Sequence, residues 1–176
     1  MKNFLITSGL NSSWKLSKKN YLLNYFTTFQ KLNRYKNKEF VYPKPYGIKL
    51  SDKIKNERYV NKISSDILKD LSNELNKYHR TSYDNRYWEI ITGNCVRRLI
   101  KVIFYRYKCL EKIINSKENL NTIASNIDDY TLSTTDSINI VYSSNDDEWN
   151  FNLISNILRI SFKKKIKIYP YKTKNS

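Results

Sequence analysis

The stretch from His79 to Ile114 limits the possible folds more than any other part of the sequence. Its apolar residues recur at steps of three and four, which is the spacing of one face of an α-helix. They are Trp88, Ile91, Cys95, Leu99, Val102, Phe104, Leu110 and Ile113. Further apolar residues widen this face beyond half of the circumference, and such a helix is normally buried on two sides. We therefore expect a central helix, with Ser82 or Asp84 capping its first turn.

A second amphipathic helix precedes the central one. The sequence predicts it from Ser51 to about His79, with Ser51 or Asp52 as its N-terminal cap. Its predicted apolar face consists of Val60, Ile63, Ile67, Leu68, Leu71 and Leu75. A break at residues 80–83 separates the two helices, so we expect them to form a helical hairpin.

The N-terminal third of the chain is expected to contribute strands and loops. Residues 4–7 predict a first strand, whereas residues 21–29 fit either a strand or a short helix. Residues 30–50 contain two of the three prolines and are expected to form a surface loop. Residues 115–136 are polar and suggest a loop with one short helix.

The C-terminal part predicts a strand, a helix and a second strand. The strands are expected at residues 137–142 and 165–171, and the helix between them is capped by Asn145 or Asp146. This succession is typical of a right-handed parallel crossover. The fold class predicted for the chain is therefore α/β and helix-rich, with a long central helical hairpin packed on a small parallel sheet. We expect residues 1–176 to form a single domain.

The composition excludes several kinds of site. The three glycines are too scattered for a dinucleotide fingerprint or a phosphate loop, which need clustered glycines. One histidine and two cysteines leave no zinc site, so no metal is expected. Cys95 and Cys109 lie about four helical turns apart, too far for a disulfide, and are expected to be reduced core residues. No apolar run is long enough to cross a bilayer, and the expected location is cytoplasmic.

The net charge of +16 has two interpretations. A strongly basic protein attracts polyanions such as nucleic acid or an anionic membrane surface. The excess, however, is mostly lysine and accompanies many Asn, Ile and Tyr residues, so a bias of the coding DNA towards A and T is a competing explanation, and the one we favour.

The candidate functional residues gather around the start of the central helix. His79 is the single imidazole and could act as an acid, a base or an anion ligand, or simply cap a helix end. Arg86, Arg97, Arg98 and Arg106 interrupt an apolar helix. A buried guanidinium needs a carboxylate or phosphate partner, although an arginine can also extend to the surface. Glu89 is a weak candidate for the partner of Arg97, since it lies two turns away.

Two further features leave similar alternatives open. Gly93 in mid-helix costs about 1 kcal/mol relative to alanine, which suggests close packing or a kink. Asp146, Asp147 and Glu148 could be catalytic carboxylates, or could only complement the dipole of the helix that they begin.

The segments LNKYH and SYDNRYWEIITGNCVRRLIKVIFYRY resemble a family of transferases encoded in O-antigen and other surface-carbohydrate gene clusters. The matching positions are Leu75-Asn76, His79, Arg86-Tyr87-Trp88, Ile90-Ile91, Gly93 and Arg106-Tyr107. The acidic-Trp-Asn segment that ends at Asn150 resembles a later element of the family. The sequence departs from the pattern at Glu89, Asn94-Cys95 and Tyr105, and lacks a Gly-Glu-Trp-Cys phrase after the first strand.

The resemblance implies the N-terminal half of a two-domain glycosyltransferase-like fold. A nucleotide-sugar donor would then bind to a C-terminal half that this chain lacks, so the chain would be truncated, split from a complementary subunit, or degenerate. The implied role is recognition of a carbohydrate or lipid-linked acceptor. His79 would be the catalytic candidate, and the substrate-binding candidates would be Arg86, Trp88, Arg97, Arg106 and Asn150.

The leading hypothesis is thus a transferase of surface polysaccharide or O-antigen biosynthesis, cytoplasmic and peripheral at the inner membrane. The alternatives are a non-enzymatic basic module that binds nucleic acid or an anionic membrane, and an inactive remnant. Interleaved tyrosines could stack on bases, which favours the first alternative.

Overall fold

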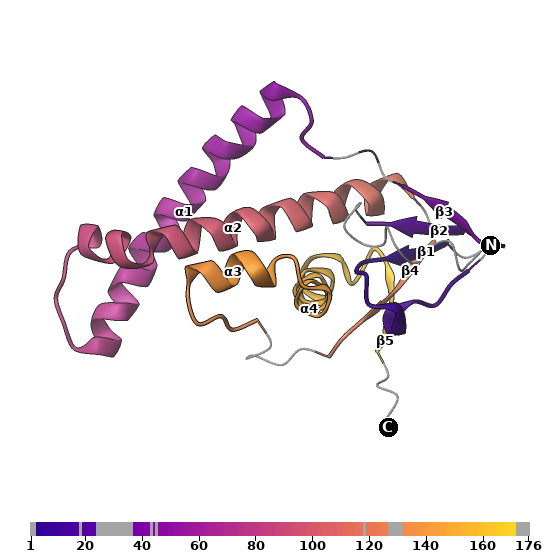
Figure 1. Cartoon of the computed structure of the whole chain (residues 1–176). Helices are drawn as coiled ribbons and strands as arrows, with labels where there is room; N and C mark the ends of the chain where they lie inside the picture. The colour runs from indigo at the N-terminus through magenta and orange to yellow at the C-terminus, as the bar shows by residue number, and fades with distance from the viewer. Residues whose placement is uncertain are drawn as a thin grey trace. The chain divides into compact units, whose positions relative to one another are not determined.

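The computed structural model of the chain contains a five-stranded, all-parallel sheet with the strand order β3-β2-β1-β4-β5 (Figure 1). The strands are β1 (Asn3–Ile6), β2 (Lys19–Leu22), β3 (Glu39–Val41), β4 (Leu120–Ala124) and β5 (Lys167–Pro170). The structure describes residues 3–17, 19–23, 37–42, 44, 46–117, 119–126 and 132–171. The central position of β1 places its loop between the two halves of the sheet.

The helices include the predicted long hairpin. They are α1 (Leu50–His79), α2 (Asn85–Ser116), α3 (Ser137–Ser143) and α4 (Asp147–Ile157), with a short 3-10 helix η1 (Asn11–Ser13). A π-helical segment, η4 (Leu158–Phe162), continues α4. The predicted class, a helix-rich α/β fold with a helical hairpin and a small parallel sheet, is confirmed. None of the described helices combines the length and apolar character that a membrane crossing requires.

The chain divides into two compact units. The sheet unit comprises residues 1–46, 106–133 and 142–176, and the hairpin unit comprises residues 47–105 and 134–141. The sheet unit contains all five strands, α4 and the last part of α2. The hairpin unit contains α1 and the first part of α2.

The core of the sheet unit is built from strand side chains that point alternately to the two faces of the sheet. Phe4, Ile6 and Leu22 form a buried cluster, and Ile6 is the register partner of Leu22. Trp14 and Leu16, from the connection between β1 and β2, pack against this cluster. Because side chains alternate along a strand, Leu5 belongs to the opposite face, and it is completely buried. Helix α4 contacts β4.

The hairpin unit buries less apolar surface than predicted. The buried residues of α1 are Val60, Ser64, Leu68 and Ser72, at steps of four, whereas the predicted face also included Ile67, which is 42% exposed. On α2, Ile90 and Ile91 are 69% and 55% exposed. The prediction that this helix is buried on two sides is therefore wrong for its first part. Its apolar residues surround the helix, while their helical neighbours cover only some of them.

Two segments adopt the opposite secondary structure to the prediction. Residues 137–142 form α3 and not a strand, because Asp136 Oδ1 accepts hydrogen bonds from the backbone N–H groups of Ile138 and Asn139 and so begins a helix. The expected short helix near Leu120 is instead β4, which pairs with both β1 and β5. The parallel crossover near the C-terminus is present, but it starts from β4.

The remaining boundaries are mostly as expected. In the undecided region of residues 21–29, Tyr21 and Leu22 belong to β2, while residues 24–29 lie outside the described residues. The loop predicted for residues 30–50 contains β3, which the sequence analysis missed. Asp84 and Asp146 cap α2 and α4 as predicted. The predicted cap of α1 is wrong, because that helix begins after Lys49 without a side-chain cap.

Candidate functional site

All strands are parallel, but the side of the sheet on which the chain adds new strands changes between β1 and β4. From β1 the chain proceeds outward to β2 and β3, and it later returns to β4 and β5 on the other side. In open parallel sheets, ligands bind at the carboxyl ends of the strands beside such a topological switch point. The residues that follow β1 and β4 are therefore the first place to look for a functional site.

The loop after β1 holds the N-terminus of α4. The Gly9 N–H donates a hydrogen bond of 2.9 Å to Asp147 Oδ1. A Cβ atom on Gly9 would lie 2.3 Å and 2.5 Å from the two carboxylate oxygens of Asp147, so only glycine permits this approach. The loop is anchored on its other side, where Trp14 Nε1 donates to the carbonyl of buried Ser8 at 3.0 Å. A carboxylate is thus fixed at the switch point.

Arg106 and Asn150 meet beside this carboxylate, in the sheet unit. Arg106 Nε donates to Asn150 Oδ1 at 3.0 Å, and its Nη2 donates to the carbonyl of Ser144 at 3.2 Å. The amide of Asn150, which is buried, donates to the carbonyls of Ser144 and Asp146. These bonds hold the turn into α4 and place polar side chains next to Asp147.

The carboxyl end of β4 carries a second guanidinium. Arg159 Nε donates to the Ser125 carbonyl at 3.0 Å, and Nη2 donates to the Ala124 carbonyl at 3.4 Å. Ser12 Oγ and the Tyr171 hydroxyl are hydrogen-bonded at 2.8 Å. Sequence reasoning did not select Gly9 or Arg159 as site residues. For Gly9, the sequence did contain a signal, which is the Ser8-Gly9 pair directly after a predicted strand.

A different group of predicted residues lies at the turn of the hairpin unit, and Asn76 is its centre. Asn76 Oδ1 accepts hydrogen bonds from Trp88 Nε1, Thr81 Oγ1 and the Tyr83 N–H, and its Nδ2 donates to the Tyr83 carbonyl. Arg80 adopts a left-handed conformation with φ 54°, which ends α1. The Leu-Asn and Arg-Tyr-Trp segments are therefore joined by hydrogen bonds that fix the turn.

His79 belongs to an aromatic group on this turn. Its ring stacks on that of Trp88, with centroids 5.7 Å apart, and meets Tyr78 edge-on at 5.0 Å. Tyr83 and Tyr87 stack on each other at 4.0 Å. His79 is exposed and Trp88 is buried, so the histidine presents an accessible edge on a fixed aromatic support.

Glu89 forms ion pairs with Arg86, which precedes it on α2, and with Arg97, which follows it. Arg86 Nη1 lies 3.2 Å from Glu89 Oε2, and Arg97 Nη2 contacts Glu89 Oε1. Hydrogen bonds from Arg97 and then Arg86 hold the pKa of the Glu89 carboxyl below its ordinary value of 4.5. The pairing predicted weakly for Arg97 is therefore present.

Gly93 explains how this pairing spans two helical turns. It lies one turn from each partner, and a Cβ atom there would be 3.0 Å from Arg97 Nη1 and 3.3 Å from Glu89 Cγ. The missing side chain lets the guanidinium pass close over the helix backbone. The close packing expected at Gly93 is confirmed, with the ion pair as its cause.

The predicted site residues thus form two groups. His79, Arg86, Trp88 and Arg97 belong to the hairpin unit, whereas Arg106 and Asn150 belong to the sheet unit. The described residues include no cluster of three or more His, Cys, Asp or Glu side chains that could hold a metal ion. Both cysteines are free; Cys109 is buried and Cys95 is half-buried.

Comparison with known proteins identifies the family of the chain. A family model described as "LIC12162 family transferase" matches residues 3–176. The chain belongs to the LIC12162 family of transferases. No curated protein and no solved structure matches the chain.

The LIC12162 family assignment covers both groups of predicted residues, because the match includes the hairpin unit as well as the sheet unit. The resemblance to a transferase family is therefore confirmed at the level of a transferase. Within this LIC12162 family member, the switch point of the sheet and the turn of the hairpin are the two sites with prearranged polar groups.

Proposed function

We propose that this LIC12162 family member takes part in transferring a glycosyl or related group during the synthesis of bacterial surface polysaccharide, such as O-antigen. The observation that carries the proposal is the fixed carboxylate of Asp147 at the switch point of a parallel sheet, in a chain that belongs to a transferase family. Ligands of such sheets bind at this edge. The sequence resemblance to surface-carbohydrate transferases supplies the narrower substrate class.

In this proposal the chain binds the acceptor. Asp147 and Arg106 offer charged groups that hydrogen-bond to sugar hydroxyls or to the phosphate of a lipid-linked sugar. Asn150 is buried, and we assign to it the positioning of Arg106. In this proposal the nucleotide-sugar donor binds apart from the acceptor site, on a complementary subunit. This arrangement would place the transfer in the cytoplasm, at the inner face of the membrane that carries the lipid-linked acceptor.

We propose the hairpin turn as a separate ligand site, contained in the hairpin unit. Arg86 has a 73% exposed side chain, and His79 is also exposed, so both can reach a ligand. We assign acid or base catalysis to His79, because the two ring nitrogens of an imidazole can donate and accept a proton. We assign anionic or hydroxyl groups of that ligand to Arg86 and Arg97, with Trp88 as the support of the turn.

The test is deletion of the gene in the bacterium that carries it, followed by complementation. The wild-type gene should restore the polysaccharide profile seen by gel electrophoresis, whereas His79→Ala and Arg86→Ala should not. Lys77→Ala is the matched control, because it removes an exposed basic side chain from the same end of α1. A deletion strain with unchanged polysaccharide would refute the transferase role. Full restoration by His79→Ala and Arg86→Ala would refute only the role assigned to the hairpin turn, and not the transferase role.

A further inference from the structure

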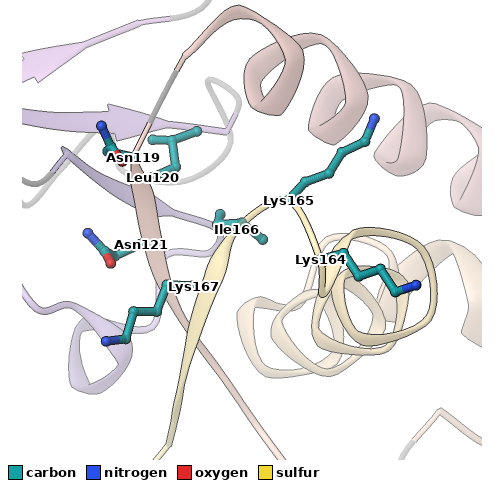
Figure 2. Close-up of a pocket in the computed structure, with 7 residues that line it drawn as sticks. All are labelled: Asn119, Leu120, Asn121, Lys164, Lys165, Ile166 and Lys167. Carbon is teal, nitrogen blue, oxygen red and sulfur yellow. The ribbon is translucent and has the colours of Figure 1, made fainter.

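A pocket lies at the amino-terminal edge of the sheet unit, where β4 and β5 begin. Its volume is about 670 Å³, within the range of small-molecule sites. The lining residues are Asn119, Leu120, Asn121, Lys164, Lys165, Ile166 and Lys167 (Figure 2). Three of the seven are lysines and none is acidic, so the pocket has a strongly positive lining.

All three lysine side chains are exposed, and Figure 2 shows Lys164 and Lys165 extending to the other side of the pocket from Lys167. Lys167 is the register partner of Asn121 across the β4–β5 pair, and Figure 2 shows both side chains extending to the same side. Lys165 Nζ donates to Asn115 Oδ1 at 3.2 Å. Leu120 and Ile166 are buried beneath this rim. None of the ion pairs between described residues involves Lys164, Lys165 or Lys167.

Two uncommon backbone conformations border the pocket. On one side, Asn119 has φ 54°, which costs free energy for any residue except glycine. On the other side, the π-helical segment Leu158–Phe162 ends directly before the lysine turn. Such segments are rare and frequently mark functional sites, because the wider turn redirects the residues that follow it. Both features would be avoidable costs if this surface were only a solvated edge.

We propose that this pocket binds a ligand that carries one or more phosphate groups. Flexible lysine ammonium groups act as point charges for phosphate, and the amide of the Asn119 side chain can donate to a phosphate oxygen. The concave shape favours a discrete phosphorylated group, from either a soluble molecule or a lipid head group. This site is independent of the proposed transfer at the carboxyl edge of the sheet.

The test is titration of the full chain with inorganic pyrophosphate by calorimetry, and sedimentation with vesicles of phosphatidylcholine, with and without phosphatidylglycerol. The variant Lys164→Ala/Lys167→Ala should weaken binding on the order of tenfold or more, as expected for two lost lysine contacts. The matched control is Lys53→Ala/Lys62→Ala, which removes two exposed lysines of α1 and should bind as the wild type. Circular dichroism should show both variants folded.

The outcomes separate the sources of the phosphate. Saturable binding of pyrophosphate that depends on Lys164 and Lys167 supports a soluble ligand. Binding only to phosphatidylglycerol vesicles, with the same dependence, supports a lipid head group. Equal weakening by both double variants would show a diffuse effect of net charge and would overturn the proposal. Absence of binding to either probe would overturn it as well.

Discussion

At the scale of single residues, two glycines leave space for the side chains of other residues. Gly9 does so for Asp147, which is distant in the sequence, and Gly93 for Glu89 and Arg97, each one helical turn away. Gly9 does not have a positive φ, so its role is the close approach of Asp147 and not backbone freedom. Gly93 gives space to the pair of Glu89 and Arg97. In both cases the observed position of a carboxylate side chain requires that the glycine has no Cβ atom.

The first prediction concerns Gly9 and Asp147. Gly9→Ala should displace the Asp147 carboxylate and destabilise the chain by about 1–2 kcal/mol, the value of one hydrogen bond to a charged group. Asp147→Ala should cost a similar amount. The double variant should cost clearly less than the sum, because the alanine at position 147 removes the atoms that the new Cβ would meet.

Urea unfolding of the four proteins measures this coupling, and Glu148→Ala is the control, since it changes an exposed neighbour in the same first turn. Additive losses in the double variant would contradict the close contact between Gly9 and Asp147.

At the scale of elements, the hairpin depends on one amide as much as on apolar packing. Asn76→Ala should destabilise the hairpin by about 1–3 kcal/mol, because buried Trp88 Nε1 loses its hydrogen-bond acceptor. Asn73→Ala, at an exposed position of the same helix, should have little effect. Thermal unfolding followed by circular dichroism compares the two variants. Equal stability of both variants would show that the Asn76 bonds contribute nothing.

The ion pairs of Glu89 predict a dependence on pH. Because the folded-state pKa of Glu89 is lowered by Arg97 and Arg86, the pairs stabilise the hairpin above the pH range in which unfolded glutamate titrates. This contribution is lost as the pH falls through the folded-state pKa.

The difference in unfolding free energy between the wild type and Glu89→Gln should therefore be constant near neutral pH and disappear in acid. Arg97→Ala should reduce the same pH dependence. A difference that persists unchanged into strong acid would contradict the assignment to the Glu89 carboxylate.

The elements also show what the sequence could and could not predict. Periodicity over a long stretch identified α1 and α2, and Asp84 and Asp146 identified two helix starts. Short β-branched runs were ambiguous, since a single cap at Asp136 makes residues 137–143 helical. Leu120–Ala124 becomes a strand only through pairing with β1 and β5, which no local pattern reveals.

The candidate site was predictable to a similar extent. His79 and Trp88 do stack at the turn, but the bond that holds Trp88 to Asn76 joins two helices and leaves no local signal in the sequence. The approach of Gly9 to Asp147 joins positions 138 residues apart, which a single sequence cannot show.

At the scale of the whole molecule, the polar groups gather at both edges of one parallel sheet. The carboxyl edge carries Asp147 beside Arg106 and Asn150, and we expect the acceptor to bind there. The amino edge carries the lysine pocket. Three of the 32 Lys and Arg residues line this pocket, and a bias in base composition can still account for other lysines.

The most direct test of the transferase site is the surface polysaccharide of a bacterium whose chromosomal copy encodes Asp147→Asn. Asparagine keeps the size and the oxygen that accepts the Gly9 N–H, and it removes the negative charge. Glu148→Gln is the matched control, because it removes a charge from the adjacent exposed residue. We predict that Asp147→Asn leaves the level and melting temperature of the chain unchanged and abolishes the polysaccharide, while the control strain makes it normally. Normal polysaccharide in the Asp147→Asn strain would contradict a functional carboxylate at the switch point.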